Sequence, residues 1–230
     1  MDYTCSDIAQ MIDYALLKPE LTEENIIQGC QVAKKYNVAA VCCSPSMVPL
    51  VKKQLEGSGI RVTTVVGFPF GFNKTETKVC EAQTAIQDGA VELDMVLHIG
   101  KLLSRDLDYV KKDIQAVVET AHRKKVAVKV IFENYYLTDE LIEIGCKLCE
   151  QAGADWVKTS TGLAGGGATI EDLKLMRKSV SDKVQIKAAG GVRDLEMVVR
   201  AREIGCTRVG TSSPEKIMEQ CYQKKGKPKS

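Results

Sequence analysis

The stretch Trp156-Val157-Lys158-Thr159-Ser160-Thr161-Gly162 is a short apolar strand pattern that carries a lysine and stops at a glycine. Lysines are mostly exposed in folded proteins, so a solvated lysine just past a strand is the ordinary interpretation. A second stretch, Ile186-Lys187-Ala188-Ala189-Gly190-Gly191, repeats the arrangement. Two lysines at the ends of neighbouring strands favour another interpretation, in which one amine is a nucleophile whose pKa is lowered by burial and by the second cation.

Strand and helix patterns alternate along the whole chain around these two stretches. The strand patterns are short and rich in β-branched residues, and helical apolar spacing separates them. Parallel strands need helical crossovers, and eight of them close into a filled barrel. The sequence therefore predicts an α/β protein with a (β/α)8 TIM barrel, and an open doubly wound sheet is the alternative. The predicted strands span residues 11–17, 38–43, 60–67, 90–97, 126–132, 154–160, 184–189 and 206–211.

The ends of the predicted helices are marked by capping residues and by glycines. No change of composition divides the chain, so residues 1–221 are predicted to form one domain. Within this domain, residues 2–10 are compatible with a short helix under the barrel. The polar residues 222–230 predict a flexible C-terminal tail. The predicted N-caps are Thr22, Thr138, Thr169, Asp194 and Ser213, and the predicted stops are Gly89, Gly153 and Gly205.

The composition excludes several classes of protein. The chain has 230 residues, 44% of them hydrophobic, which is enough for one large domain. Its 32 basic and 30 acidic residues are interspersed, so nucleic acid is not an expected partner. The apolar runs are strand-sized and the N-terminus lacks a signal-peptide pattern, so we expect no membrane partner and a cytoplasmic location. Nine cysteines, mostly on helical or strand patterns, predict reduced and buried thiols; those considered are Cys30, Cys42, Cys80, Cys146 and Cys149.

Period-two alternation predicts which side chains face the barrel interior. On the fourth strand the apolar residues Val91, Leu93 and Met95 face the helices, which turns the acidic residues between them inward. Unpaired charges inside a barrel cost several kcal/mol each, so they must neutralise one another or lose protons. A purely structural salt-bridge cluster is the alternative to an active site here. The predicted inward set is Glu92, Asp94, Lys129, Lys158 and Lys187.

Three predicted loops at one end of the barrel are rich in glycine and small hydroxyl side chains. Glycines let the backbone approach an anion, and the helix N-terminus that follows supplies free N–H groups and a positive dipole. In barrels of this kind, the loops after strands seven and eight are the usual phosphate site. Arg193 either contacts the phosphate or only solvates the start of its helix. The candidate residues are Thr161, Gly162, Gly190, Gly191, Arg193, Gly210, Ser212 and Ser213.

These segments resemble the deoxyribose-phosphate aldolase family at residues 157–162, 186–193 and 210–213. The similarity continues in the same order through residues 16–19, 42–45, 66–71 and 92–96. The resemblance implies a class I aldolase that reversibly cleaves 2-deoxy-D-ribose 5-phosphate into D-glyceraldehyde 3-phosphate and acetaldehyde. It further implies no metal and no cofactor other than a covalent lysine imine, and small-molecule partners, namely the phosphorylated sugar and its aldehydes. A homo-oligomer is compatible with the sequence.

The resemblance also assigns roles to individual residues. It implies that Lys158 forms the Schiff base, that Lys187 perturbs its pKa and assists proton transfer, and that Asp94 is the acid/base partner. It implies phosphate binding at the glycines and serines of the three loops. The residues alone do not choose between Lys158 and Lys187 as nucleophile.

The chain departs from that family away from the proposed catalytic residues. Many members read Asp-His-Thr where this chain has Asp13-Tyr14-Ala15, and both Asn134-Tyr135-Tyr136 and the Gly165–Gly167 run are unusual. Another Schiff-base barrel aldolase acting on a different sugar phosphate, or a barrel that binds a phosphorylated ligand without turnover, stays compatible with the sequence. A zinc-dependent aldolase is disfavoured because His98 and His122 are the only histidines.

Overall fold

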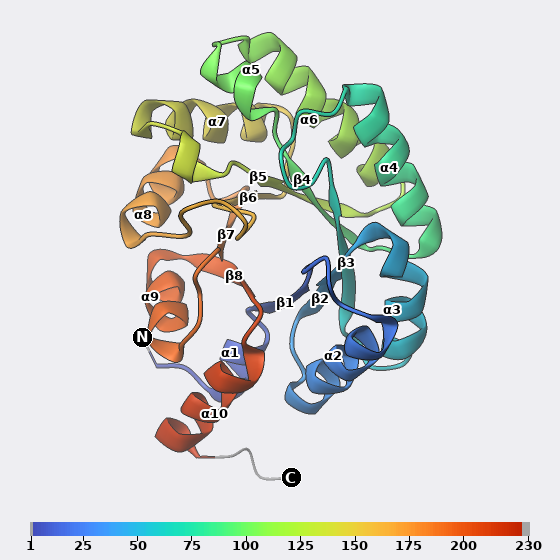
Figure 1. Ribbon diagram of the computed structural model, residues 1–230. Helices are drawn as coiled ribbons and strands as arrows, with labels where there is room; N and C mark the ends of the chain where they lie inside the picture. Colours follow the sequence, from blue (N-terminus) through green and yellow to red (C-terminus); the bar gives the residue numbers. More distant parts are fainter. Residues whose placement is uncertain (1, 227–230) are drawn as a thin grey trace.

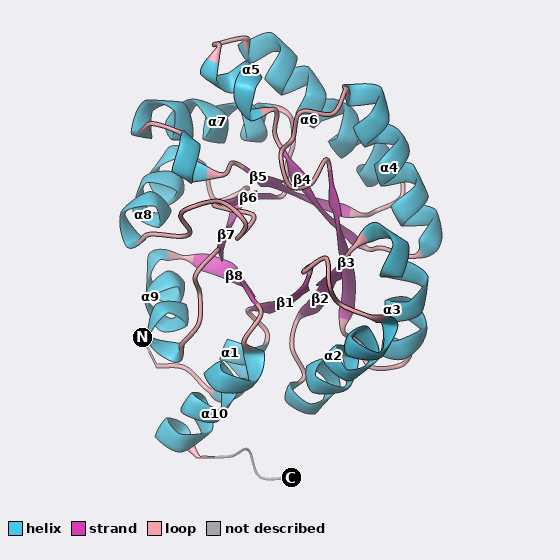
Figure 2. Ribbon diagram, in the orientation of Figure 1, coloured by secondary structure: helices cyan, strands magenta, loops and turns pink. Residues whose placement is uncertain are grey.

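Eight parallel strands close into a ring, and the helices surround them (Figure 1). The computed structural model describes residues 2–226, and Figure 2 separates the inner strands from the outer helices by colour. Each strand pairs with the next in the chain and β1 pairs with β8, so the predicted (β/α)8 barrel is confirmed. The strands are β1 Ile12–Leu16, β2 Ala40–Cys43, β3 Arg61–Val66, β4 Glu92–Val96, β5 Ala127–Ile131, β6 Trp156–Lys158, β7 Gln185–Ala189 and β8 Cys206–Thr211.

The helices begin largely where capping chemistry predicts. Thr22, Thr138, Thr169 and Asp194 each accept a backbone N–H of the first helical turn on the side chain, whereas the Ser213 side chain makes no such bond. Within the described residues, no helix combines the length and apolar character needed to cross a membrane. The helices are α1 Cys5–Ala9, α2 Glu23–Tyr36, α3 Val48–Leu55, α4 Thr75–Asp88, α5 Ile99–Leu103, α6 Leu107–His122, α7 Asp139–Gln151, α8 Ile170–Ser179, α9 Leu195–Ile204 and α10 Pro214–Lys225, with 3-10 turns η1 Pro45–Met47 and η2 Asn134–Tyr136.

Strand register places the charged residues side by side inside the barrel. Asp94 of β4 lies opposite Lys129 of β5, and Lys158 of β6 lies opposite Lys187 of β7. All five residues predicted to point inward are at most 3% exposed. Val91 was predicted to pack against the helices, but it is 45% exposed. It lies one residue before β4, and the alternation of faces applies only to residues within a strand.

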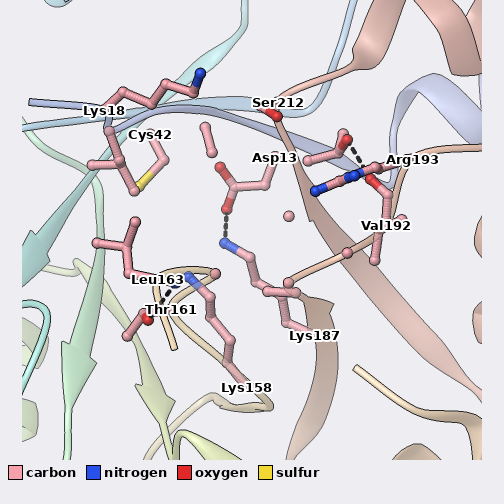
Figure 3. Close-up of a pocket in the computed structure, with 18 of the residues that line it drawn as sticks. Asp13, Lys18, Cys42, Lys158, Thr161, Leu163, Lys187, Val192, Arg193 and Ser212 are labelled. Atoms are coloured by element: carbon pink, nitrogen blue, oxygen red, sulfur yellow. Dashed lines mark hydrogen bonds and ion pairs between the residues drawn. The ribbon is translucent and has the colours of Figure 1, made fainter. Parts of the chain in front are cut away.

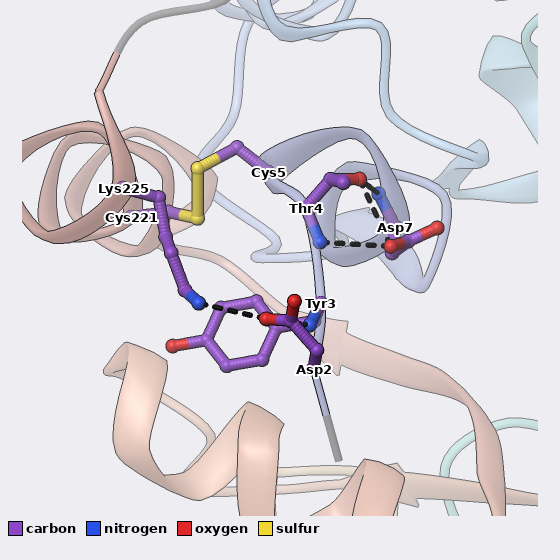
Figure 4. The surroundings of a disulfide bond; sticks show 7 residues. All are labelled: Asp2, Tyr3, Thr4, Cys5, Asp7, Cys221 and Lys225. Atoms are coloured by element: carbon purple, nitrogen blue, oxygen red, sulfur yellow. Dashed lines mark hydrogen bonds and ion pairs between the residues drawn. A yellow bond between two sulfur atoms is a disulfide. The ribbon is translucent and has the colours of Figure 1, made fainter.

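The two ends of the chain are joined by a disulfide between Cys5 in α1 and Cys221 in α10 (Figure 4). The two Cα atoms are 5.8 Å apart across a sequence separation of 216 residues. Beside the disulfide, Lys225 Nζ lies 3.0 Å from Asp2 Oδ1. The expectation that the cysteines are reduced is wrong for this pair, because only closure of the barrel brings the first and last helices together. A cross-link around so long a segment is worth up to about 5 kcal/mol in the chain-entropy model.

The remaining seven cysteines are free thiols, as predicted. Six of them are buried, and burial raises the pKa of the Cys30 thiol to about 11. Cys80 departs from the prediction because it lies exposed on α4. These thiols are therefore mostly small apolar side chains of the core.

The predicted C-terminal tail overlaps the last helix. Helix α10 continues through Tyr222 to Lys225 because Ile217, Met218 and Cys221 form a buried stripe on it. The first residues of the predicted 222–230 tail are therefore helical, and residues 227–230 lie outside the described part of the chain.

Candidate active site

A network of buried charges occupies the barrel interior, with Asp94 at its centre. Asp94 Oδ2 accepts hydrogen bonds from Lys158 Nζ at 2.6 Å and Lys187 Nζ at 2.7 Å. Its other oxygen accepts one from Lys129 Nζ at 2.9 Å. Asp13 pairs with Lys187 and lies 3.7 Å from Lys129 Nζ. These five residues come from β1, β4, β5, β6 and β7, so closure of the barrel is what assembles the network.

The three lysines differ in the number of carboxylates around them. Among the described residues, Lys158 has one carboxylate within 4 Å, Lys187 has two and Lys129 has three. Burial disfavours the charged form of each, but the surrounding carboxylates outweigh it and raise the pKa of Lys187 and Lys129. For Lys158, burial together with the charge of Lys187 outweighs the single carboxylate and lowers the pKa. The geometry thus favours Lys158 as the nucleophilic amine, a choice that the residues alone left open.

Two carboxylates complete this part of the network. Burial acts to raise the pKa of Asp94, but Lys129, Lys158 and Lys187 hold it well below its usual range. Asp13 was not among the predicted site residues, although it stands on β1 and faces the interior. Its Oδ1 is buried and has no hydrogen-bond partner within residues 2–226, and Asp13 lines the cavity beside the lysines. An unpaired buried acceptor costs about 1–3 kcal/mol, so this oxygen is free to accept a hydrogen bond from a molecule in the cavity.

A second ion cluster lies in the same interior but away from the cavity. The Glu92 carboxylate accepts two hydrogen bonds from Arg208, at 3.0 and 3.1 Å, and Lys129 Nζ lies 2.6 Å from it. Lys129 Nζ and Arg208 Cζ each lie 5.6 Å from the centroid of the Trp156 ring. Burial acts to raise the pKa of Glu92, but Lys129 and Arg208 lower it to about 2. Arg208 was not predicted, because polar and apolar residues are mixed along β8 and do not mark one face of the strand as buried.

A cavity adjoins the two lysines at the mouth of the barrel (Figure 3). Lys158, Lys187 and Asp13 form its inner wall, and loops after β1, β6, β7 and β8 form the outer wall. Ser213 is the one predicted phosphate-site residue that does not line it; its N–H donates to Thr211 Oγ1 at 3.0 Å, at the start of α10. The predicted residues that do line it are Thr161, Gly162, Gly190, Gly191, Arg193, Gly210 and Ser212.

Glycine is required where the loops meet. Gly190 has φ +83°, and a Cβ there would lie 2.8 Å from Gly167 Cα and 3.1 Å from Ser160 Cβ. Gly162 has φ +88°, in the left-handed region that favours glycine. At Gly162 and Gly190 the two loops therefore present backbone to the cavity, which suits an anion held by N–H groups.

The two histidines have structural partners. His98 Nδ1 accepts the Lys101 N–H at 3.2 Å and caps α5, and His122 Nε2 lies 2.9 Å from Asp155 Oδ2. Across residues 2–226, no three His, Cys, Asp or Glu side chains are grouped so that they could hold a metal ion.

A buried lysine of lowered pKa, an ionised carboxylate beside it and a glycine-lined cavity at the mouth of a (β/α)8 barrel are the arrangement of a barrel aldolase. Comparison with known families agrees: residues 7–213 match the DeoC/LacD family of aldolases. The chain belongs to that family.

Its relatives cover nearly the whole chain. The deoxyribose-phosphate aldolase of Thermococcus gammatolerans is 50% identical over 93% of this chain and 96% of that protein. The one from Treponema denticola is 45% identical over 90% of this chain and 96% of that protein. The solved structure of the deoxyribose phosphate aldolase of Aeropyrum pernix, described as tetrameric, superposes with a TM-score of 0.88 at 31% identity, covering 96% of this chain and 93% of that one.

Proposed function

We propose that this aldolase reversibly cleaves 2-deoxy-D-ribose 5-phosphate into D-glyceraldehyde 3-phosphate and acetaldehyde through an imine on Lys158. The observation that carries the proposal is the contrast among three buried lysines, of which Lys158 alone has a lowered pKa. Of these three buried lysines, Lys158 and Lys187 line the cavity. The names and coverage of the relatives support the substrate.

The reaction begins when the neutral Lys158 amine attacks the aldehyde carbon of the open-chain sugar. The carbinolamine loses water to give a protonated imine, which draws electrons from the C2–C3 bond as the C3 hydroxyl loses its proton. The bond breaks, D-glyceraldehyde 3-phosphate leaves, and the enamine takes a proton at C2. Water then hydrolyses the imine and releases acetaldehyde.

Proton transfers in this sequence fall to the groups beside Lys158. Asp94 is ionised among the three lysines before the reaction and does not line the cavity. It accepts a proton through a water from the carbinolamine and returns it to the enamine. Lys187 keeps its proton and supplies the positive charge that lowers the pKa of Lys158. The free Oδ1 of Asp13 accepts a hydrogen bond from a substrate hydroxyl.

The phosphate binds at the outer wall of the cavity. Backbone groups of the Gly162, Gly190 and Gly210 loops, with Ser212 and Arg193, surround it. This binding energy, remote from the reacting bond, positions the aldehyde against Lys158.

Reductive trapping tests the proposal. Acetaldehyde with borohydride should reduce an adduct onto the protein, and peptide mapping should find it on Lys158, with most of the label lost in Lys158→Arg. Recovery of the label on Lys129 or Lys187 would overturn the assignment, and no label at all would leave a barrel that binds a phosphorylated ligand without turnover.

A chelator should leave cleavage unchanged, because the proposed chemistry uses no metal; loss of activity that zinc restores would contradict it.

The proposal extends to the oligomeric state and the cellular location of the enzyme. The tetramer described for the Aeropyrum pernix relative supports a homo-oligomer. Seven of the nine cysteines are free thiols, which supports the cytoplasm because reduced cysteines persist there, whereas the Cys5–Cys221 disulfide is a bond that this compartment rarely keeps.

A further inference from the structure

Two unusual segments of the sequence contact each other at the rim of the cavity. Tyr135 belongs to the turn after β5, and Gly165 and Gly166 belong to the loop between β6 and α8. A Cβ on Gly165 would lie 2.9 Å from Tyr135 Cζ, and one on Gly166 would lie 2.9 Å from Tyr135 Cδ2. The Tyr135 ring therefore covers the backbone of the loop directly, at a distance that only glycine permits.

Glu133 holds the start of the same loop. Its carboxylate accepts the Thr161 N–H at 3.2 Å and also the Thr161 hydroxyl proton. Glu133 is 2% exposed and has φ +54°, a left-handed conformation that costs a non-glycine residue about 1 kcal/mol or more. The next residue anchors this conformation, because the Asn134 N–H donates to Thr159 O at 3.0 Å.

The end of the loop is fixed against the next one. The Ala168 N–H donates to Ala189 O at 3.1 Å and to Gly190 O at 3.0 Å. A Cβ on Gly167 would lie 2.4 Å from Gly190 O. Residues 161–168 are thus held at the start by Glu133, in the middle by Tyr135 and at the end by β7 and the loop after it. Gly162 and Leu163, which line the cavity, lie between the first two contacts.

We propose that Glu133 and Tyr135 act as a clamp that positions the β6–α8 loop for the substrate phosphate, and so set the affinity for phosphorylated sugars. The inference rests on the proposed function, which puts the phosphate at this loop. Neither residue lines the cavity, so both are positioning residues rather than catalytic ones. Tyr135 is 58% exposed, and its ring contributes more to the loop than to the core.

Removing the ring tests the clamp with little risk to the fold. Tyr135→Ala should raise KM for 2-deoxyribose 5-phosphate about tenfold and leave kcat within about a factor of two, since the loop binds the remote phosphate and not the reacting carbons. The same variant should cleave unphosphorylated 2-deoxyribose as the unchanged protein does. Phe72→Ala is the matched control, because Phe72 is an aromatic residue of similar exposure, 65%, on the β3–α4 loop, and it stacks on Phe70.

A double substitution tests the contact itself. Gly166→Ala has no backbone obstacle at this position but drives its new methyl group into the Tyr135 ring. It should raise KM by a similar factor, and adding it to Tyr135→Ala should change little, because both variants break one contact. Effects that multiply in the double variant would overturn the proposal.

Hydrogen exchange tests the clamp independently of the proposed substrate. In Tyr135→Ala without any sugar, peptides spanning residues 159–169 should exchange faster than in the unchanged protein, and Phe72→Ala should not alter them. Unchanged exchange in this segment, or an equal loss for both sugars, would overturn the clamp. If the unchanged protein shows no preference for the phosphorylated sugar, the proposed substrate fails, and the exchange result alone decides whether the clamp exists.

Discussion

The barrel interior holds two charge clusters that look alike in the sequence and differ in the structure. Around Glu92, the carboxylate is held by the two terminal guanidinium nitrogens of Arg208 and by Lys129, and neither Glu92 nor Arg208 lines the cavity. Around Asp94, the lysines have unequal numbers of carboxylates, and one buried oxygen of Asp13 has no partner in the part of the chain that the structure describes. Buried charge alone therefore does not mark a catalytic site.

The Asp94 cluster differs in two ways: its charges are not fully paired, and it adjoins the cavity. A fully paired cluster has no group left to bind or react, and its contribution is to structure. A lysine with one carboxylate, beside a second cation and a cavity, has an amine that can lose its proton and reach a substrate. Lys129 contacts both clusters, so the two are physically connected, and substitutions can show how far they act separately.

The largest effect is expected at Asp94. Asp94→Asn keeps the size of the side chain and removes the base, so kcat should fall by about 10²–10⁴-fold while the affinity for the phosphorylated sugar persists. Steady-state kinetics and direct binding would measure the two effects. Thermal unfolding of the variant should also be measured, because the substitution leaves three lysines with one carboxylate fewer and can lower stability. A kcat within about threefold of the unchanged protein would make Asp94 a structural partner, like Glu92.

Alternation along the strands predicted much of this site, and its limits are physical. Asp94 and Lys187 were readable because apolar neighbours on the same strand fix which face is buried, whereas Lys158 was singled out by its place at the end of a strand. Asp13 and Arg208 stand on β1 and β8, whose short mixed patterns gave no such frame. Their partners lie across the closure of the barrel or more than 100 residues away in the chain, and a local pattern carries no information on such distances.

The fold itself was predictable because each β/α unit is local. Short strands, capped helices and glycine stops recur within about thirty residues, and closure follows from their number. The disulfide between Cys5 and Cys221 was not predictable for the opposite reason, since it depends on where the first and last helices meet after closure. Glu133 was missed because its role comes from a left-handed backbone that no propensity predicts.

An intermediate effect, on stability instead of turnover, is expected at Arg208. Arg208→Met retains the length of the side chain but leaves Glu92 with one partner fewer in a buried place. The free energy of unfolding should fall by about 3 kcal/mol, measured by denaturant titration, because the lost pairing is not replaced by water. At a temperature where the variant is folded, kcat/KM should stay within about threefold. A loss of turnover as large as that of Asp94→Asn, with no loss of stability, would show that the two clusters act as one unit.

The smallest effect is expected at the outer wall of the cavity, far from both clusters. Ser212 is exposed and lines the cavity where the phosphate is proposed to bind. Ser212→Asp places a negative charge beside that anion, and in these partly wet surroundings the repulsion is about 1 kcal/mol, or roughly a fivefold rise in KM for 2-deoxyribose 5-phosphate. The rise should shrink as salt is added, because exposed charges are screened.

Two controls decide what this result means. Unphosphorylated 2-deoxyribose should be cleaved as before, since it has no charge to repel. Ser213→Asp should have the weaker effect, because Ser213 does not line the cavity. If both sugars lose the same factor, the substitution has damaged the lysine site and the phosphate assignment for this loop is wrong. If Ser213→Asp has the larger effect, the phosphate lies closer to the start of α10 than the wall of the cavity indicates, and the helix N-terminus is its main binding group.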